Sequence, residues 1–280
     1  MPKWAVSAGA AIAAIVAAIA VAPTSANAAT ATAYKGVGIA TGPSVTADLT
    51  ASGASWYYNW SASPSGTTRG VAFVPMIKTG SNVNTTTLNK VKHEGRYLLT
   101  FNEPDEKNEA NMSVATAIRL WPRLEATGME LSTPTLAGGT NTTTGWLGQF
   151  MRAARARHYR VNFVTVHWYG QHNWTKPATN VSELKNYLVE TYRLYHLPIW
   201  LTEFSLINFQ GREPSYATPG QEASFLTAAT KMLATLPYVQ RYAWYTLTGK
   251  KAGGNTILYT RGPSTATAVE KVFKKAPTRA

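Results

Sequence analysis

Two glutamates stand at the ends of apolar runs and could work as a catalytic pair. Glu103 follows the run 97–102, and Pro104 ends that strand because proline has no backbone N–H and disfavours an α conformation before it. Glu203 lies near the end of the run 199–204. A glutamate at the rim of a sheet, half out of water, can have a raised pKa. Taken alone, Glu103 could instead cap the next segment, and Glu203 could pair with a lysine or arginine.

The segments around these glutamates alternate between strands and helices. Near-continuous apolar strands that alternate with helices indicate a parallel sheet covered by helices. Eight such units in about 250 residues favour an α/β fold of the (β/α)₈ TIM barrel type, in a single domain. The expected strands are 36–40, 54–60, 71–77, 97–102, 130–136, 161–169, 199–204 and 239–247. The expected helices are 87–93, 113–127 (capped by Ser113 and kinked by Pro122), 146–156, 182–195, 221–235 and 265–273.

In such a barrel the catalytic residues come from the C-terminal ends of the strands. Alternation by two in the strand 161–169 places His167 and Tyr169 on the inward face and Trp168 on the face toward the helices. Taken singly, the histidine and the tryptophans would more often be core residues. The other side chains expected at this rim are Asn102, Tyr58, Trp60, Trp244 and Tyr245.

A facing pair of carboxyl groups suits the cleavage of glycosidic bonds. One carboxyl protonates the leaving oxygen while the other acts at the anomeric carbon. The strands that carry Glu103 and Glu203 are expected on opposite sides of the barrel mouth, with room for a sugar between them. Burying two uncompensated carboxylates in one barrel is costly unless function requires it, and excess aromatic rings suit stacking on flat ligands.

Composition narrows the class of protein further. The chain has no cysteine, so neither a disulfide nor a thiolate metal site is possible. The formal net charge is +13, but the nearest approach to a basic block is Arg152, Arg155, Arg157 and Arg160 around one expected helix. We interpret the charge as serving solubility and adhesion to anionic surfaces, with no nucleic acid as a partner.

The first 28 residues have the pattern of a secretory signal peptide. Lys3 supplies the positive start, residues 5–22 are apolar, and residues 26–28 form a small-residue cleavage site. An uncleaved membrane anchor is the alternative, although the run is slightly short of the ~20 residues that a span needs. Cleavage after Ala28 is expected to leave residues 29–280 as a secreted catalytic domain that is not membrane-bound.

Three motifs resemble the Asl1-like glycosyl hydrolase catalytic domain, glycoside hydrolase family 128. They are Leu99-Thr100-Phe101-Asn102-Glu103-Pro104-Asp105, Val166-His167-Trp168-Tyr169-Gly170 and Trp200-Leu201-Thr202-Glu203-Phe204. The resemblance covers nearly all of the mature chain and is firmest over residues 97–247.

This resemblance implies a retaining endo-β-1,3-glucanase that acts on β-glucan as a monomer, without a cofactor or metal. It implies that Glu103 is the general acid/base and Glu203 the nucleophile, so Glu203 is expected to have the lower pKa. Asn102 would bond the sugar 2-hydroxyl, and His167 and Tyr169 would orient Glu203. The candidate sugar platforms are Tyr58, Trp60, Trp168 and Trp244.

Other functions would use the same residues. The carboxyl pair would also serve hydrolysis of another β-glycan, such as mannan or a β-1,4-glucan, or transglycosylation. From a different class, a barrel of this type could be a non-catalytic lectin or inhibitor. Such proteins usually lack one of the two glutamates, and both are present here.

Overall fold

The computed structural model describes residues 34–39, 45–66, 70–248, 255–260 and 265–278. The expected signal peptide, 1–28, and residue 40 of the first expected strand lie outside these ranges. Among the helices in these ranges, none is long and apolar enough to cross a membrane.

The larger sheet has six strands, and every neighbouring pair in it is parallel. Its order is β3-β2-β1-β11-β8-β7. The strands are β1 (Lys35–Gly38), β2 (Trp56–Tyr58), β3 (Ala72–Phe73), β7 (Val164–Tyr169), β8 (Ile199–Ser205) and β11 (Val239–Tyr245).

The smaller parallel sheet has the order β4-β5-β6, with β4 (Met76–Ile77), β5 (Tyr97–Asn102) and β6 (Glu130–Thr135). Only Val74 and Pro75 separate β3 from β4, so the strand expected at 71–77 is split between the two sheets. On the other side, a parallel bridge between Ser132 and Phe163 links β6 to the segment before β7. The fold is therefore a parallel α/β fold whose two sheets adjoin at both edges.

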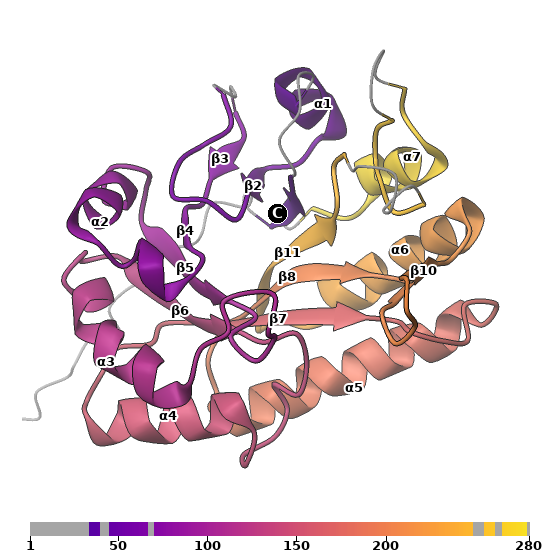
Figure 1. The fold of residues 1–280 in the computed structure, drawn as a ribbon. Coiled ribbons are helices and arrows are strands. Elements are labelled where there is room, and N and C mark those ends of the chain that lie inside the picture. Colours follow the sequence, from indigo (N-terminus) through magenta and orange to yellow (C-terminus); the bar gives the residue numbers. More distant parts are fainter. Residues whose placement is uncertain (1–33, 40–44, 67–69, 249–254, 261–264, 279–280) are drawn as a thin grey trace, which may run out of the picture.

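Helices surround the strands, as Figure 1 shows. Side chains of Asn84, Ser113, Thr218 and Thr267 accept hydrogen bonds from backbone N–H groups in the first turns of four helices, including the expected Ser113 cap. Pro122 does not interrupt its helix. The helices are α1 (Val45–Ser52), η2 (Gly80–Asn82), α2 (Thr85–Val91), α3 (Val114–Glu125), α4 (Trp146–Ala156), α5 (Pro177–Tyr195), α6 (Pro219–Ala234) and α7 (Ala268–Lys275).

An aromatic cluster fills the space near the N-terminal ends of the strands. The guanidinium of the buried Arg241 lies 4.1 Å from the ring centroid of Trp200, 4.7 Å from that of Tyr97 and 5.6 Å from that of Trp56. Burial lowers the pKa of Arg241 to about 10. This end of the strands is thus packed, and the opposite end is left for the site.

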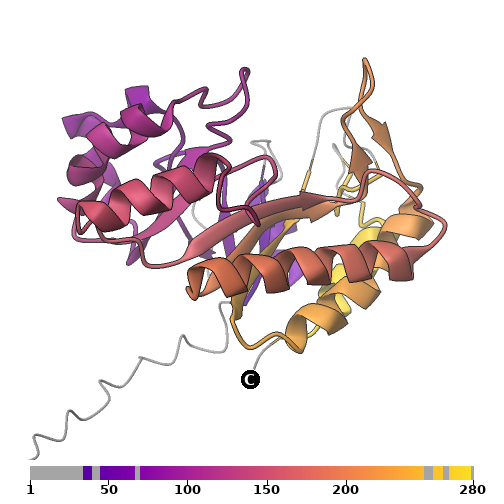
Figure 2. The ribbon, with the colours of Figure 1, turned by 90° about the horizontal axis from the view of Figure 1, so that it is seen from below.

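A small hairpin follows β8 and was not expected from the sequence. Its strands are β9 (Ile207–Asn208) and β10 (Ser215–Tyr216), which pair antiparallel. Figure 2 shows that it projects beyond the ends of the parallel strands. The backbone N–H of Leu206, at the start of the hairpin, donates to both carboxyl oxygens of the buried Glu222 on α6 at 3.2 and 3.1 Å.

Candidate active site

Glu103 stands just past the end of β5, where the backbone makes a sharp turn. Phe101 and Glu103 have positive φ values of 28° and 45°, which are uncommon for residues other than glycine. The N–H of Glu103 donates to the carbonyl of Thr135 at 2.7 Å, which ties the turn to β6. This backbone fixes where the Glu103 side chain enters the site.

Glu203 lies within β8 and is 4 % exposed. The hydroxyl of Tyr58 donates to its Oε1 at 3.0 Å, and Nε1 of Trp60 donates to the same oxygen at 2.9 Å. The hydroxyl of Tyr169 donates to Oε2. Donors on both oxygens fix the orientation of the carboxyl group and favour its ionised form.

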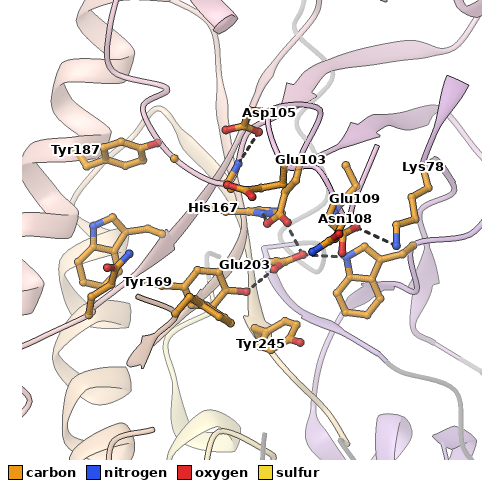
Figure 3. A pocket seen from close by; sticks show the side chains of 18 residues that line it. Lys78, Glu103, Asp105, Asn108, Glu109, His167, Tyr169, Tyr187, Glu203 and Tyr245 are labelled. Carbon is orange, nitrogen blue, oxygen red and sulfur yellow. Dashed lines mark hydrogen bonds and ion pairs between the residues drawn. The ribbon is translucent and has the colours of Figure 1, made fainter. Parts of the chain in front are cut away.

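His167 lies between the two glutamates and is 1 % exposed (Figure 3). Its Nδ1 is hydrogen-bonded to Oε1 of Glu103 at 2.8 Å. Its Nε2 lies 3.3 Å from Oε1 of Glu203, close enough for charge interaction but without a hydrogen bond to any described residue. His167 therefore contacts both carboxyl groups, and not Glu203 alone as the sequence led us to expect.

The same three residues have a spacing that could hold a metal ion. One ligand atom from each of Glu103, His167 and Glu203 lies within 4.8 Å of the other two. Nδ1 of His167 is already hydrogen-bonded to Glu103, so a metal ion bound through this nitrogen would have to displace that bond. What the three residues form by themselves is a carboxyl pair joined through one imidazole.

Burial and the charges within this triad together shift the pKa values of Glu103, His167 and Glu203. Burial raises the pKa of Glu203 above 4.5, despite lowering by His167 and the donors of Tyr169 and Trp60. Burial also raises the pKa of Glu103, but the hydrogen bond and charge of His167, together with the charge of Lys78, outweigh it, and the net pKa is lowered. Burial lowers the pKa of His167, and the two glutamates outweigh that effect, so its pKa is raised. The expectation that Glu203 has the lower pKa is therefore wrong for this structure.

The triad opens into a cavity of about 980 Å³. Asn102 lines this cavity together with Glu103, His167 and Glu203, as expected. Its Nδ2 donates to Oε2 of Glu109 at 3.2 Å, while its buried Oδ1 has no hydrogen-bond partner among the described residues.

Two residues that were expected to be sugar platforms, Trp244 and Tyr58, are buried and do not line the cavity. Trp244 is fully buried, contacts the ring of Phe204, and donates from Nε1 to the carbonyl of Thr256 at 2.7 Å. Tyr58 is also fully buried, and its hydroxyl supports Glu203. Neither ring face is available to a sugar, because the strands that carry them are covered by other side chains.

The other two aromatic candidates do line the cavity. Trp60 presents its ring there while its Nε1 donates to Glu203. Trp168 is half-buried: it lines the cavity and also stacks on Phe225 of α6, with ring centroids 5.6 Å apart. The alternation that directs Trp168 toward the helices therefore holds, although the strand end leaves part of it at the cavity.

Several lining residues were not expected from the sequence. Phe209 on the hairpin is 48 % exposed and packs edge-on against Tyr169, with centroids 5.0 Å apart. Tyr245, by contrast, was expected at this rim together with Trp244, and it faces the cavity while Trp244 does not, as alternation along the strand allows. Polar and charged residues at the cavity include Lys78, Asp105, Glu106, Glu109 and Tyr187.

Two carboxyl groups facing each other at the ends of parallel strands, within a cavity that also exposes aromatic rings, define a glycoside hydrolase site. A family model described as glycosyl hydrolase catalytic core matches residues 34–273. The chain belongs to this glycosyl hydrolase family and is a glycoside hydrolase.

Solved structures of glycoside hydrolase family 128 are similar to the chain over most of its length. A subgroup I endo-β-1,3-glucanase from Amycolatopsis mediterranei, in complex with laminaritriose, is 42% identical, with a TM-score of 0.82 over 88% of this chain and 100% of that one. A subgroup II endo-β-1,3-glucanase from Sorangium cellulosum is 27% identical, with a TM-score of 0.71 over 88% and 100%. A curdlan-specific subgroup III exo-β-1,3-glucanase from Blastomyces gilchristii is 25% identical, with a TM-score of 0.64 over 87% and 98%.

Among curated proteins, alkali-sensitive linkage protein 1 of Schizosaccharomyces pombe is 28% identical over 216 residues. The match takes in 74% of this chain but 37% of that protein. The chain therefore corresponds to one part of that longer relative.

Proposed function

We propose that this protein is a secreted, retaining endo-β-1,3-glucanase. The linkage is supported by the 42% identity to an endo-β-1,3-glucanase that binds laminaritriose. We further infer that the two parallel sheets close into a (β/α)₈ barrel over residues 29–280, that residues 1–28 are removed on export, and that the enzyme acts as a monomer. A mature N-terminus at Ala29, measured by intact mass, tests the export step.

The spacing of the two glutamates carries the proposal of retention. Retaining enzymes hold their carboxyl groups about 5–5.5 Å apart, whereas inverting enzymes need about 6.5–9.5 Å to admit a water molecule between sugar and base. One carboxyl oxygen of Glu103 and one of Glu203 lie within 4.8 Å of each other. This spacing suits direct attack by one carboxylate on the anomeric carbon.

In the first step, Glu203 attacks the anomeric carbon and forms a glycosyl-enzyme ester as the bond to the leaving oxygen breaks. Glu103 donates a proton to that oxygen. Because the pKa of Glu103 is lowered and that of His167 is raised, we place this proton between Nδ1 of His167 and Oε1 of Glu103 before substrate binds.

In the second step, a water oxygen attacks the anomeric carbon while Glu103 takes a proton from that water, and the ester bond to Glu203 breaks. Asn102 bonds the sugar 2-hydroxyl during both steps. Trp60, Trp168 and Phe209 offer ring surface to the neighbouring sugars.

The test is NMR of the first product formed from a β-1,3-glucan, alongside a reducing-end assay on mannan and β-1,4-glucan. The expected first product is the β-anomer, formed from the β-1,3-glucan only. An initial α-anomer would refute the retaining mechanism. Failure to cleave any β-1,3-glucan would refute the proposal that β-1,3-glucan is the substrate. Fragments of intermediate length among the early products support internal cleavage, while release of glucose alone would contradict it.

A further inference from the structure

Lys78, Asn102 and Glu109 form a row along one side of the cavity. Nδ2 of Asn102 donates to Oε2 of Glu109 at 3.2 Å, and Nζ of Lys78 lies 3.1 Å from the same oxygen. Figure 3 shows Lys78 and Glu109 joined beside the catalytic pair. One carboxylate oxygen thus receives both a lysine ammonium and the Asn102 amide.

The backbone brings these three residues together independently of their side chains. The N–H of Asn102 donates to the carbonyl of Lys78 at 2.9 Å, and the N–H of Ala110 donates to the carbonyl of Asn102 at 3.0 Å. The turns after Glu103 therefore fold back on the end of β5 and place Glu109 beside Asn102. Two backbone hydrogen bonds make this contact a built feature of the fold.

The contact determines which end of the Asn102 amide faces Glu109. An ionised carboxylate can only accept hydrogen bonds, so the amide nitrogen must face it; the flipped amide would place two acceptor oxygens against each other. The nitrogen carries two hydrogens, and Glu109 uses one. No other acceptor among the described residues bonds this nitrogen, so the second N–H can donate to a sugar hydroxyl.

We propose that Glu109 is a positioning residue that sets the orientation of the Asn102 amide toward the sugar 2-hydroxyl, and that Lys78 holds Glu109 in place. This inference rests on the proposed function, in which Asn102 bonds that hydroxyl. Lys78 also supplies positive charge to a cavity that Glu103, Asp105 and Glu106 line. Without Lys78, repulsion from these neighbours would favour moving the Glu109 carboxylate away from Asn102.

Two substrates distinguish a loss of Asn102 positioning from a general loss of activity. One is 2,4-dinitrophenyl β-laminaribioside, and the other is its analogue without the 2-hydroxyl on the sugar next to the leaving group. Glu109→Gln can donate as well as accept, so it no longer selects one amide orientation. It should lower kcat on the parent compound about tenfold, the size expected for losing one well-placed hydrogen bond in the transition state, and leave kcat on the 2-deoxy analogue nearly unchanged.

Three further variants complete the test. In an Asn102→Ala background, Glu109→Gln should cause no additional loss on the parent compound. Lys78→Met should show the same selective loss as Glu109→Gln, in smaller degree. Glu106→Gln removes a carboxylate from the lining of the same cavity, and in the described residues its hydrogen bonds involve the backbone alone, so its effect should be equal on both substrates.

The inference is overturned if Glu109→Gln slows both substrates equally, or if its effect persists after Asn102→Ala. Thermal melting of each variant shows whether the protein is still folded, and Glu109→Asp supplies a second variant that keeps the charge but shortens its reach. Failure of the wild-type enzyme to cleave the parent compound would refute the proposed function instead.

Discussion

Nδ1 of His167 lies 2.8 Å from Oε1 of Glu103, and both groups sit beside Glu203. The three groups interact too closely to titrate separately, so their protons are shared across the triad. A change in the charge of His167 therefore alters the pKa values of both glutamates in the same direction. This coupling gives the enzyme's pH dependence a structural origin that can be tested.

His167→Gln should move the whole pH profile of kcat/KM to higher pH. His167 lowers the pKa of both Glu103 and Glu203, so its removal should raise both values. The acid limb reports ionisation of the nucleophile and the alkaline limb reports loss of the acid's proton, so both limbs should shift upward. The control is His172→Gln, since His172 is exposed and faces Glu183. A profile that changes in height without moving contradicts the coupling.

Tyr169→Phe should shift the acid limb of the same profile alone. The lost hydroxyl donates to Oε2 of Glu203 and lowers its pKa, so the variant should need a higher pH to ionise the nucleophile. Loss of a hydrogen bond to a charged group costs about 1.5–3 kcal/mol, or roughly 10- to 100-fold in rate.

Tyr245→Phe is the matched control for that variant. Tyr245 packs against Tyr169, with ring centroids 5.8 Å apart, yet no hydrogen bond joins its hydroxyl to Glu203 in the described part of the chain. The acid limb of the kcat/KM profile should move much less in Tyr245→Phe than in Tyr169→Phe. Equal shifts in the two variants would show that the hydroxyl of Tyr169 has no special part in holding Glu203 ionised.

Glu203→Ala should lower kcat by about 10⁴-fold, equivalent to about 5.5 kcal/mol in the activation barrier. Azide should restore part of the activity on an activated glycoside by entering the space left by the carboxylate. The product should be an α-glycosyl azide, because azide attacks the face that Glu203 attacked. Recovery of the β-glycosyl azide from this variant would reverse the assignment of the two glutamates.

Phe209→Ala and Trp244→Ala should have opposite effects on binding and stability. Phe209 is exposed at the cavity rim, so its loss should raise KM several-fold, or about 1 kcal/mol, with little change in Tm. Trp244 is buried, so its loss should destabilise the fold by about 3–5 kcal/mol. Melting curves and oligosaccharide titration distinguish the two. A Trp244→Ala protein that melts normally but binds sugar poorly would show that Trp244 is a sugar platform after all.

The sequence predicted the strand ends that meet at the site because those strands carry unambiguous apolar runs. Glu103, His167, Tyr169 and Glu203 end or follow such runs, and parallel pairing brings their ends to one edge. The position of Trp244 was mistaken because alternation tells which residues share a face, but not which side chains cover it.

Other structural features could not be predicted from the pattern of apolar and polar residues. The hairpin β9–β10 has two-residue strands, too short for a periodic signal, so Phe209 could not be placed. Helix α1 was missed for a different reason: its buried residues are Val45, Asp48, Leu49 and Ser52, so half of the buried face is polar and the sequence shows no apolar stripe. The role of Glu109 depends on the turns after Glu103, where backbone hydrogen bonds and positive φ values set the path of the chain.

Glu222→Gln should change how stability depends on pH, without altering the catalytic groups. Burial on α6 raises the pKa of Glu222 well above its ordinary value of 4.5. Between 4.5 and the folded-state pKa, the native protein holds a proton on this residue that the unfolded chain releases. The wild-type protein therefore loses stability as pH rises through this window, and the contribution is fully present only below it.

Glutamine at position 222 cannot ionise, and its carbonyl oxygen can still accept the N–H of Leu206 that both carboxyl oxygens now share. The Tm of the wild type minus that of Glu222→Gln should therefore decrease as the pH rises above about 4.5. Glu183→Gln is the control for the substitution itself, because it makes the same change on α5 at a side chain that is 41% exposed. A Tm difference for Glu222→Gln that is constant or increases with pH would show that this carboxyl group is ionised in the folded protein.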